Sequence, residues 1–301
     1  MLDYRLLEAL AAVIETGGFE KAAQKLHLTQ SAVSQRLQQL ERRLGQPVVL
    51  RSSPPVATPL GRRLNNHLQQ VKQLELGLIE EAQDEPLKVR LTVNADSMAT
   101  WLAEGLAASS LSSQMDFDLV VEDQEVGLNR MRNGEVMACI CADSQAVNGG
   151  AVSPLGVLRY RALASPDFVE RHQTRQYPHQ LVEAPCLIFN QDDRLQHRFL
   201  EKLKLPAPKR QHRCPSSEGF VQMALMGLGY GMLPEIQVQD ALKEGKLIDV
   251  AETFHLDIPL YWHYWQTESA ALAELRRAVI EHASKVLNPV HPYSNKPDAR
   301  S

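Results

Sequence analysis

The first sixty residues consist of short apolar-periodic stretches separated by sharp breaks. Apolar residues recur at helical spacing over about 3–15, and Gly17 and Gly18 end the helix that this spacing predicts. A second short helix is predicted over 19–26, and after a tight turn a third over about 30–44. The pattern is therefore helix, short helix, tight turn, helix.

The third predicted helix presents two different stripes. One stripe is apolar and consists of Val33, Leu37, Leu40 and Leu44. The other is polar but nearly uncharged, whereas an ordinary solvated helix face carries Glu and Lys; it consists of Ser31, Ser34, Gln35 and Gln38. Glutamine can bond adenine in a bidentate way and serine can donate or accept, so this face suits DNA base edges. Thr29 is placed as the N-cap, and Arg36, Arg42 and Arg43 flank the face within reach of phosphates.

A β-hairpin is predicted directly after this helix. Residues 47–50 form a short strand, 51–55 turn, and Val56-Ala57 return as a second strand. Thr58 then caps another helix. A small helical bundle with an incidental polar face is the alternative interpretation. The hairpin favours a winged helix-turn-helix instead, because a wing follows the recognition helix in that fold.

Residues from about 58 to 82 are predicted to form one long helix with an apolar seam. The seam repeats at a spacing close to 3.5 residues and consists of Leu60, Leu64, Leu68, Val71, Leu74 and Leu78. This period favours a coiled-coil partner, since helix-turn-helix proteins normally bind two half-sites as dimers. A helix packed on its own domain is the alternative. The sequence Asp84-Glu85-Pro86 ends the helix.

After Pro86 the pattern changes to alternating strands and helices. Strands are predicted at 87–93, 117–122 and 136–142, with helices over 99–108 and 125–134 between them. A second unit follows, with strands at 157–164, 187–189 and 229–234 and a helix over 217–226; a strand at 260–265 and a helix over 269–286 return to the first unit. Such βαβ repeats predict a mostly parallel sheet covered by helices, here in two lobes like a periplasmic binding protein.

The expected domains are therefore a winged helix-turn-helix over 1–58, a linker helix over 59–85 and a two-lobed α/β effector domain over 86–287. Lobe I covers about 86–160 and 260–287, and lobe II about 161–259. The last segment, 288–301, is rich in Pro and Asn and is expected to be a flexible tail. The fold class is α plus α/β.

Three polar segments lie at the ends of the predicted strands, where ligands of such sheets bind. Two of them open helices, whose free N–H groups suit a carboxylate; they contain Asn94, Asp96 and Ser97, and Ser217 and Glu218. The third is the acidic pair Glu122 and Asp123, which suits a cationic group. Together they predict a zwitterionic effector with an extra positive charge. The alternative for the acidic pair is a solvated loop.

Charge is distributed unevenly along the 301 residues. The formal net charge is −4, yet residues 1–65 contain nine basic and five acidic side chains, against 23 and 31 in the remainder. A basic head on an acidic body is the pattern of a chain that meets phosphate at one end. No run of about 18 apolar residues predicts a membrane helix, and the N-terminus lacks the pattern of a secretory signal, so a cytoplasmic protein is expected. The four cysteines are interpreted as small apolar residues or free thiols, with no disulfide or metal site expected.

The stretch FEKAAQKLHLTQSAVSQRLQQLERRLGQPVVLR, followed by T-P-L-G, resembles the LysR-type transcriptional regulators. The resemblance implies major-groove contacts by Gln30, Ser31, Ser34 and Gln35, and a wing contact to the DNA backbone by Arg51. Many members of the family carry a second basic wing residue where this chain has Val56, which leaves the contact at that position open. The family implies promoter DNA, a small-molecule effector and RNA polymerase as partners, and a homodimer that assembles further into a tetramer.

Other segments narrow the resemblance within that family. VNADSMATWL, VED, S-S-E-x-F-V-Q and L-Y-W-H are similar to regulators that respond to arginine and lysine and control amino-acid transport or metabolism. The resemblance thus implies L-arginine or L-lysine as effector and no cofactor. The sequence favours no enzyme: the glycines of Gly227-Leu228-Gly229-Tyr230-Gly231 follow a helix instead of a strand, and Ser217 lacks a nucleophile elbow, so no catalytic residue is assigned. A regulator of another metabolite, or an architectural protein of replication origins that senses nothing, is the alternative.

Overall fold

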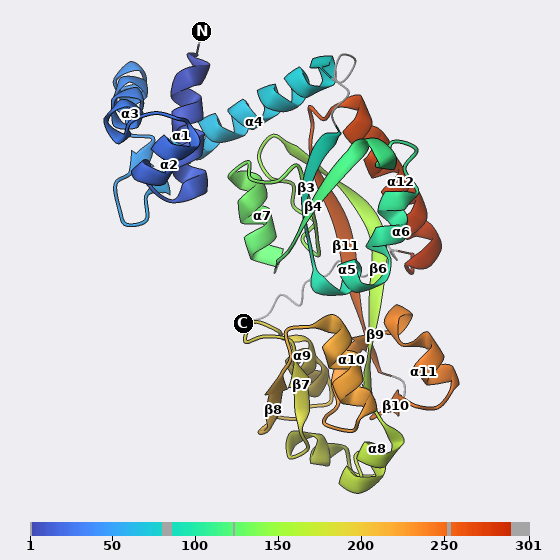
Figure 1. Cartoon of the computed structure of the whole chain (residues 1–301). Helices are drawn as coiled ribbons and strands as arrows, with labels where there is room; N and C mark the ends of the chain where they lie inside the picture. Colours follow the sequence, from blue (N-terminus) through green and yellow to red (C-terminus); the bar gives the residue numbers. More distant parts are fainter. Residues whose placement is uncertain (1, 80–85, 123, 252–253, 290–301) are drawn as a thin grey trace. The chain divides into compact units, whose positions relative to one another are not determined.

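The computed structural model describes residues 2–79, 86–122, 124–251 and 254–289 (Figure 1). The N-terminal part contains the predicted helices and hairpin. Its elements are α1 (Tyr4–Thr16), α2 (Phe19–Lys25), α3 (Gln30–Leu44), β1 (Val49–Leu50), β2 (Val56–Ala57) and α4 (Pro59–Ile79). The two strands pair antiparallel, with Leu50 opposite Val56 and Val49 opposite Ala57. The predicted winged helix-turn-helix is therefore confirmed.

Side chains and glycines fix the ends of these helices as the sequence indicates. The Asp3 carboxylate accepts from the Arg5 N–H at 3.2 Å and begins α1, and Gly17 adopts a left-handed φ of 66° and ends it. The Thr29 hydroxyl accepts from the Ala32 N–H at 3.2 Å, so Thr29 is the N-cap of α3. The tight turn between α2 and α3 is thus set by local chemistry.

Replacing Thr29 with alanine should lower the stability of the DNA-binding domain by about 1 kcal/mol, because the first turn of α3 loses its side-chain acceptor. The Thr29→Ser variant keeps a hydroxyl at the same position and should stay close to the parent. Chemical denaturation of the three proteins measures the difference, and equal midpoints for the alanine and serine variants would contradict the cap.

The apolar seam of α4 is used in two ways. Leu64 and Leu68 are buried in the core of the helix-turn-helix, with the inner faces of α1, α2 and α3. Farther along the helix, the Leu74 side chain is 51% exposed. Residues 80–82, and the side chain of Leu78, lie outside the described residues. The first part of the seam therefore packs on its own domain, and pairing through the rest stays a prediction.

The chain divides into two compact units. The first contains Met1–Val93, Ser109–Ser153 and Trp262–Ala278, and the second contains Asn94–Ala108, Pro154–Tyr261 and Val279–Ser301. Each unit therefore draws on segments that are distant in sequence. The domain limits expected from the sequence stay a prediction, and the predicted tail lies mostly outside the described residues, which end at 289.

The first unit contains a parallel sheet whose middle strand is β3. β3 (Leu87–Val93) pairs in parallel with β4 (Met115–Val121) on one side and with β5 (Ala138–Cys141) on the other. The helix α7 (Gln124–Arg132) connects β4 to β5, and β11 (His255–Trp265) and α12 (Ala270–Val286) each contribute residues to both units. Cys139 and Cys141 are buried in β5. The βαβαβ pattern predicted after Pro86 is confirmed.

The second unit is built around β6 (Gly150–Ala164), which begins in the first unit and pairs antiparallel with β9 (Gly231–Pro234) and β10 (Ile248–Asp249). β7 (Cys186–Ile188) pairs in parallel with β8 (Gln211–Arg213). The helices of this unit are α5 (Ala95–Thr100), α6 (Leu102–Ala107), α8 (Pro166–His172), α9 (Leu195–Lys202), α10 (Ser217–Leu225) and α11 (Gln239–Lys243). The α + α/β fold class expected from the sequence is confirmed.

The prediction of one helix over 99–108 is wrong in its start and its continuity. The helix begins at Ala95, directly after the strand, and breaks at Trp101, whose side chain is only 1% exposed. The Trp101 indole is buried between α5 and α6, and this burial interrupts the helix although the sequence pattern is continuous there. In the described part of the chain, no helix is long and apolar enough to cross a membrane.

Candidate functional site

The polar stripe of α3 lies on the surface of the DNA-binding domain. Gln30, Ser31, Gln35 and Gln38 are exposed, and Ser34 and Arg36 are half-buried beside them. The Ser31 and Thr29 hydroxyls hydrogen-bond each other at 2.9 Å, so both take part in the cap of the helix. The stripe therefore offers amide and hydroxyl groups on one face, with the apolar stripe at Val33, Leu37 and Leu40 buried behind it.

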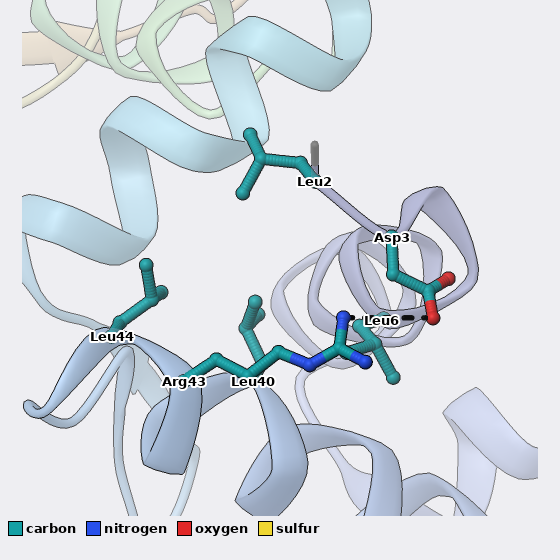
Figure 2. A pocket seen from close by; sticks show the side chains of 6 residues that line it. All are labelled: Leu2, Asp3, Leu6, Leu40, Arg43 and Leu44. Carbon is teal, nitrogen blue, oxygen red and sulfur yellow. Dashed lines mark ion pairs between the residues drawn. The ribbon is translucent and has the colours of Figure 1, made fainter.

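The arginines around this stripe differ in what holds them. The Arg43 guanidinium points toward Asp3, the N-cap of α1, with a nitrogen–oxygen distance of 3.9 Å, at a pocket otherwise lined by leucines (Figure 2). The Arg42 Nε donates to the Gln38 carbonyl at 3.3 Å. In the wing, the exposed Arg51 guanidinium lies 5.9 Å from the centre of the Phe19 ring. The Arg43 side chain thus lies toward the start of α1, and the Arg51 guanidinium is positioned by the aromatic ring of Phe19.

The second unit contains an acidic site around Asp96 in the first turn of α5. The Tyr160 hydroxyl donates to one Asp96 carboxylate oxygen at 2.6 Å, and the Ser217 hydroxyl donates to the other at 2.7 Å. Tyr160 comes from β6 and Ser217 from the start of α10. Within the described residues no lysine, arginine or histidine forms an ion pair with Asp96. Both oxygens are therefore held by neutral donors, and Asp96 has no cationic partner in the part of the chain that the structure describes.

Burial raises the pKa of Asp96 above its usual value, although the hydrogen bonds from Tyr160 and Ser217 lower it. The negative charge of Asp193 raises it further. Asp193 accepts from the backbone N–H groups of Phe189 at 2.8 Å and of Leu195 at 3.0 Å, at the end of β7. Burial also raises the pKa of Tyr160 well above its usual value, so this phenol stays a neutral donor. Asp193 thus brings a second acidic side chain close to Asp96.

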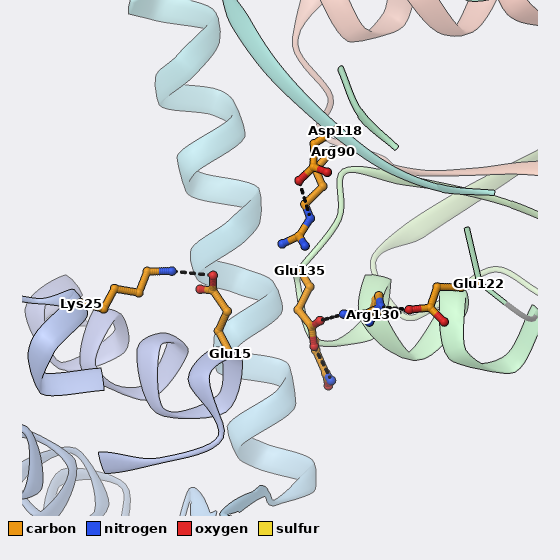
Figure 3. A network of polar contacts seen from close by, with 8 residues as sticks. Glu15, Lys25, Arg90, Asp118, Glu122, Arg130 and Glu135 are labelled. Carbon is orange, nitrogen blue, oxygen red and sulfur yellow. Dashed lines mark hydrogen bonds and ion pairs between the residues drawn. The ribbon is translucent and has the colours of Figure 1, made fainter. Parts of the chain in front are cut away.

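Glu122 lies in the first unit and is already neutralised. The Arg130 Nε donates to a Glu122 oxygen at 2.9 Å, and the same guanidinium donates to Glu135 at 2.8 Å (Figure 3). Asn133 donates to the other Glu135 oxygen at 3.1 Å. The neighbouring predicted residue, Asp123, lies outside the described residues. The charge of Glu122 is therefore shared with a protein cation, in contrast to that of Asp96.

The other predicted effector residues lie near the ends of α5 and α10. The Asn94 Oδ1 and the Ser97 Oγ are buried and have no hydrogen-bond partner among the described residues, and Ser97 is fully buried. Glu218 is exposed in the first turn of α10, where the Ser216 hydroxyl accepts from the Gly219 N–H at 3.1 Å. The structure thus brings Asp96 and Ser217 together, although 121 residues separate them.

Sequence reasoning missed Tyr160, Asp193 and Gln237, whose side-chain oxygen lies 3.1 Å from the Ser217 hydroxyl. A signal for Asp193 was present. Asp192 and Asp193 follow the predicted strand at 187–189, as Glu122 and Asp123 follow the strand before them. Tyr160 gave no signal, because an aromatic residue inside a strand is ordinarily part of the core.

Family models match both parts of the chain. Residues 4–62 match the family described as "Bacterial regulatory helix-turn-helix protein, lysR family", and residues 82–284 match the "LysR substrate binding domain". Both matches agree with the resemblance noted in the sequence.

Curated relatives match nearly the whole chain. The HTH-type transcriptional regulator ArgP of Pseudomonas aeruginosa (strain UCBPP-PA14) is 49% identical over 290 residues, covering 94% of this chain and 96% of the relative. The protein of the same name from Aeromonas salmonicida is 40% identical over 296 residues, covering 96% and 99%.

Solved structures agree with these matches. The crystal structure of ArgP from Mycobacterium tuberculosis has a TM-score of 0.85 at 36% identity, and full-length LysG from Corynebacterium glutamicum with bound effector Arg has a TM-score of 0.79 at 30% identity. Each covers 96% of this chain and 100% of its own. The relatives are named as regulators and not as enzymes, and the chain belongs to the LysR family of bacterial regulatory helix-turn-helix proteins.

Proposed function

We propose that this protein is a transcriptional regulator that binds promoter DNA through α3 and the wing and senses a basic amino acid, arginine or lysine. It would thereby control genes of amino-acid transport or metabolism. The observation that carries the effector class is the Asp96 carboxylate, which receives only neutral hydrogen bonds from Tyr160 and Ser217 and lies near the second acid, Asp193. A half-buried carboxylate with no cationic partner among the described residues favours a ligand that brings a cation.

The DNA-binding half of the proposal rests on the exposed stripe of α3. Gln35 and Gln38 are exposed one turn apart and can reach base edges, as Gln30, Ser31 and Ser34 can from the first turns. Arg36 and Arg51 are suited to phosphates on either side, and Thr29 holds the N-terminus of the helix in place.

The effector half assigns the two ends of an amino acid to different groups. A cationic ammonium or guanidinium group would bind Asp96, since a charge-assisted hydrogen bond to a carboxylate is about twice as strong as a neutral one. The effector's carboxylate would bind the free N–H groups at the start of α10, beside Ser217 and Glu218. Asn94 and Ser97 have buried side-chain oxygens close to the start of α5 that find no hydrogen-bond partner among the described residues. The arginine bound to the relative LysG supports this class of effector.

The assembly and the response follow from the same proposal. A second copy would pair through the exposed part of α4 that includes Leu74, and two such dimers would form a tetramer on DNA. Effector binding would shift the balance between two states of the effector domain and so change contact with RNA polymerase in the cytoplasm. The effector can do so only by binding the two states unequally.

Calorimetric titration of the full-length protein tests the effector class. L-arginine and L-lysine are compared with L-citrulline, which has the shape of arginine but a neutral side chain. Saturable binding of arginine or lysine and none of citrulline supports the proposal. A protein that binds specific DNA but neither amino acid would be a regulator of another metabolite. Weak binding that tolerates any DNA sequence, together with no ligand, would favour an architectural protein.

Arginine affinity should fall as the pH is lowered. The cation binds the ionised form of Asp96, and burial together with Asp193 raises the pKa of this carboxyl above its usual value. Below that raised pKa the free protein must release a proton before it binds, so affinity should fall by up to about tenfold per pH unit. Titrations between pH 8 and 5 measure this, and an affinity that rises toward acid would contradict the role of Asp96.

A further inference from the structure

The second unit exposes a concentrated group of cations, although the chain after residue 65 is acidic overall. Between residues 194 and 213 the sequence contains seven Lys and Arg side chains and a single acid, Glu201. All seven cations are exposed and form the basic surface of α9 and β8: Arg194, Arg198, Lys202, Lys204, Lys209, Arg210 and Arg213. Among the described residues only Lys209 of this group forms an ion pair, with Glu183 at 2.5 Å. The other six cations are therefore available to a partner.

Helical periodicity gathers three of these cations into a stripe. Arg194 directly precedes α9, and Arg198 and Lys202 follow at intervals of four residues, so the three project from one side of the helix. The other side is buried in the unit, where Phe199 and Leu200 are both 0% exposed. At a rise of about 1.5 Å per residue, the stripe is about 12 Å long. A helix anchored in the core thus holds the stripe at the surface.

Packing places α9 on one face of the strands β7 and β9. Tyr230, which bridges to Cys186 of β7, and Gly231, the first residue of β9, are consecutive, so their side-chain positions lie on opposite faces. The Tyr230 ring centre lies 6.5 Å from that of Phe199 in α9, whereas a Cβ atom at Gly231 would clash with the Phe220 ring of α10. α9 therefore covers the face opposite to α10.

The register of the strands places Arg213 on the same face as α9. β7 and β8 are parallel, with Leu187 opposite His212 and Ile188 opposite Arg213. Leu187 packs in one cluster with Phe220 of α10, so the next residue, Ile188, points to the face of α9, and Arg213 points there beside it. Cations from the helix and from the edge strand thus lie on one side of the unit.

The basic surface of α9 and β8 favours a polyanion over an acidic protein as its partner. Residues 194–213 are all described, and none of their large apolar side chains is exposed. A protein interface would contain an apolar core, whereas the phosphates of DNA are bound by cations alone. Double-stranded DNA carries one negative charge per about 1.7 Å, so a stripe of about 12 Å can face about seven phosphates.

We propose that the basic surface of α9 and β8 is a second DNA-binding surface, which binds the phosphate backbone of double-stranded DNA outside the segment that α3 contacts. This inference rests on the proposed function, because binding through α3 raises the effective concentration of the flanking DNA. Phosphate contacts carry no sequence information, so the surface adds affinity without adding specificity. It also makes binding to long DNA more sensitive to salt, because each phosphate contact releases counterions.

The test compares two DNA duplexes by fluorescence anisotropy at several KCl concentrations. The short duplex is the site that the full-length protein enriches from a randomised-sequence library, and the long duplex carries the same site between added flanks. On the long duplex, Arg198→Ala/Lys202→Ala should reduce the salt slope by about 1.8, which is about 0.9 for each of two phosphates. It should bind this duplex roughly tenfold more weakly at about 0.1 M KCl. On the short duplex the variant should match wild type.

Two variants control for charge, and thermal melting of each variant controls for folding. Lys243→Ala/Lys246→Ala removes the same charge elsewhere in the second unit, where each lysine already pairs with an acid, and it should leave both slopes unchanged. Arg198→Lys/Lys202→Arg keeps both cations and should bind the long duplex as wild type does. These controls distinguish a local contact with phosphates from a general effect of net charge.

Equal salt slopes of wild type and Arg198→Ala/Lys202→Ala on the long duplex overturn the inference and point to an acidic protein as the partner. An equal loss on both duplexes overturns it as well, since the surface would then act through net charge. Single-stranded RNA that binds wild type more tightly than duplex flanks of the same length, and does so through Arg198 and Lys202, would replace DNA as the occupant. Specific binding of the short duplex by both proteins keeps the proposed function intact in each of these cases, whereas enrichment of no sequence counts against both proposals.

Discussion

The Asp96→Asn variant should lose arginine and lysine binding by about 30-fold or more, since removing one partner of a buried, hydrogen-bonded charge pair costs about 2–5 kcal/mol. The amide has the shape of the carboxylate, whose two oxygens accept from the Tyr160 and Ser217 hydroxyls at 2.6 and 2.7 Å. Its oxygen can accept from one hydroxyl and its NH2 group can donate to the oxygen of the other, so both hydroxyls keep a partner while the charge is removed. Titration calorimetry with arginine measures the loss.

The same substitution should not harm the free protein. Burial raises the pKa of Asp96, so the folded state binds this proton more tightly than the unfolded state. The ionised group therefore destabilises the fold at a pH above its raised pKa, and this destabilisation disappears as the pH falls. Asparagine carries no charge at any pH. Without effector, the melting temperature of Asp96→Asn at neutral pH should equal or exceed that of the wild type.

Glu122→Gln is the matched control, since it also replaces an acid that the sequence places at a strand end. Glu122 receives hydrogen bonds from Arg130, which also bonds Glu135, so the loss of one acid leaves the guanidinium partnered. Arginine binding by this variant should stay within about threefold of wild type. Loss of binding by Glu122→Gln with normal binding by Asp96→Asn would move the cation site to the first unit.

The DNA-binding half was predictable because its signals are local. Thr29, Gly17 and the stripe from Val33 to Leu40 each act within a few residues, through a cap, a left-handed turn and helical periodicity. The three helices predicted before the wing begin and end within one residue of the observed ones. The wing follows in the same way from a short apolar run and its turn. The sequence did not predict which part of the apolar seam of α4 packs on its own domain. The burial of Leu64 and Leu68 depends on the face that α1 presents.

The effector site was predictable only in part, since it is assembled over long distances in sequence. Asp96 and Ser217 were selected because each lies in a polar segment that opens a predicted helix, at the strand ends where ligands of open α/β sheets bind. Their contact, however, requires two segments 121 residues apart to meet, and Tyr160 reaches Asp96 from 64 residues away. The sequence also assigned a carboxylate ligand to the start of α5, whereas the unpaired charge of Asp96 favours a cation. Whether a charged side chain finds an opposite charge depends on the tertiary structure. The ion pair of Glu122 with Arg130, like the lack of a cation beside Asp96 among the described residues, was therefore not predicted from the sequence.

The Gly61→Ala variant should unfold the DNA-binding domain at physiological temperature and abolish DNA binding. A Cβ atom at position 61 would lie 2.0 Å from the Val48 carbonyl oxygen, a backbone atom of the wing. Nothing flexible is available to move, because that oxygen accepts from the Thr58 N–H at 3.0 Å and the Thr58 hydroxyl accepts from the Gly61 N–H at 3.1 Å. Separating α4 from the wing should cost at least about 3 kcal/mol, the upper range of overpacking effects.

Gly18→Ala is the appropriate control in the same domain, since no atom lies within 4 Å of a Cβ at that position and its φ of −173° is open to any residue. Its cost should stay below about 1 kcal/mol, the difference expected at a helix N-cap. Because the Asp96 site lies in the other compact unit, full-length Gly61→Ala should still bind arginine while it no longer binds DNA. Near-normal melting and DNA binding of Gly61→Ala would show that α4 does not approach the wing as closely as the structure has it.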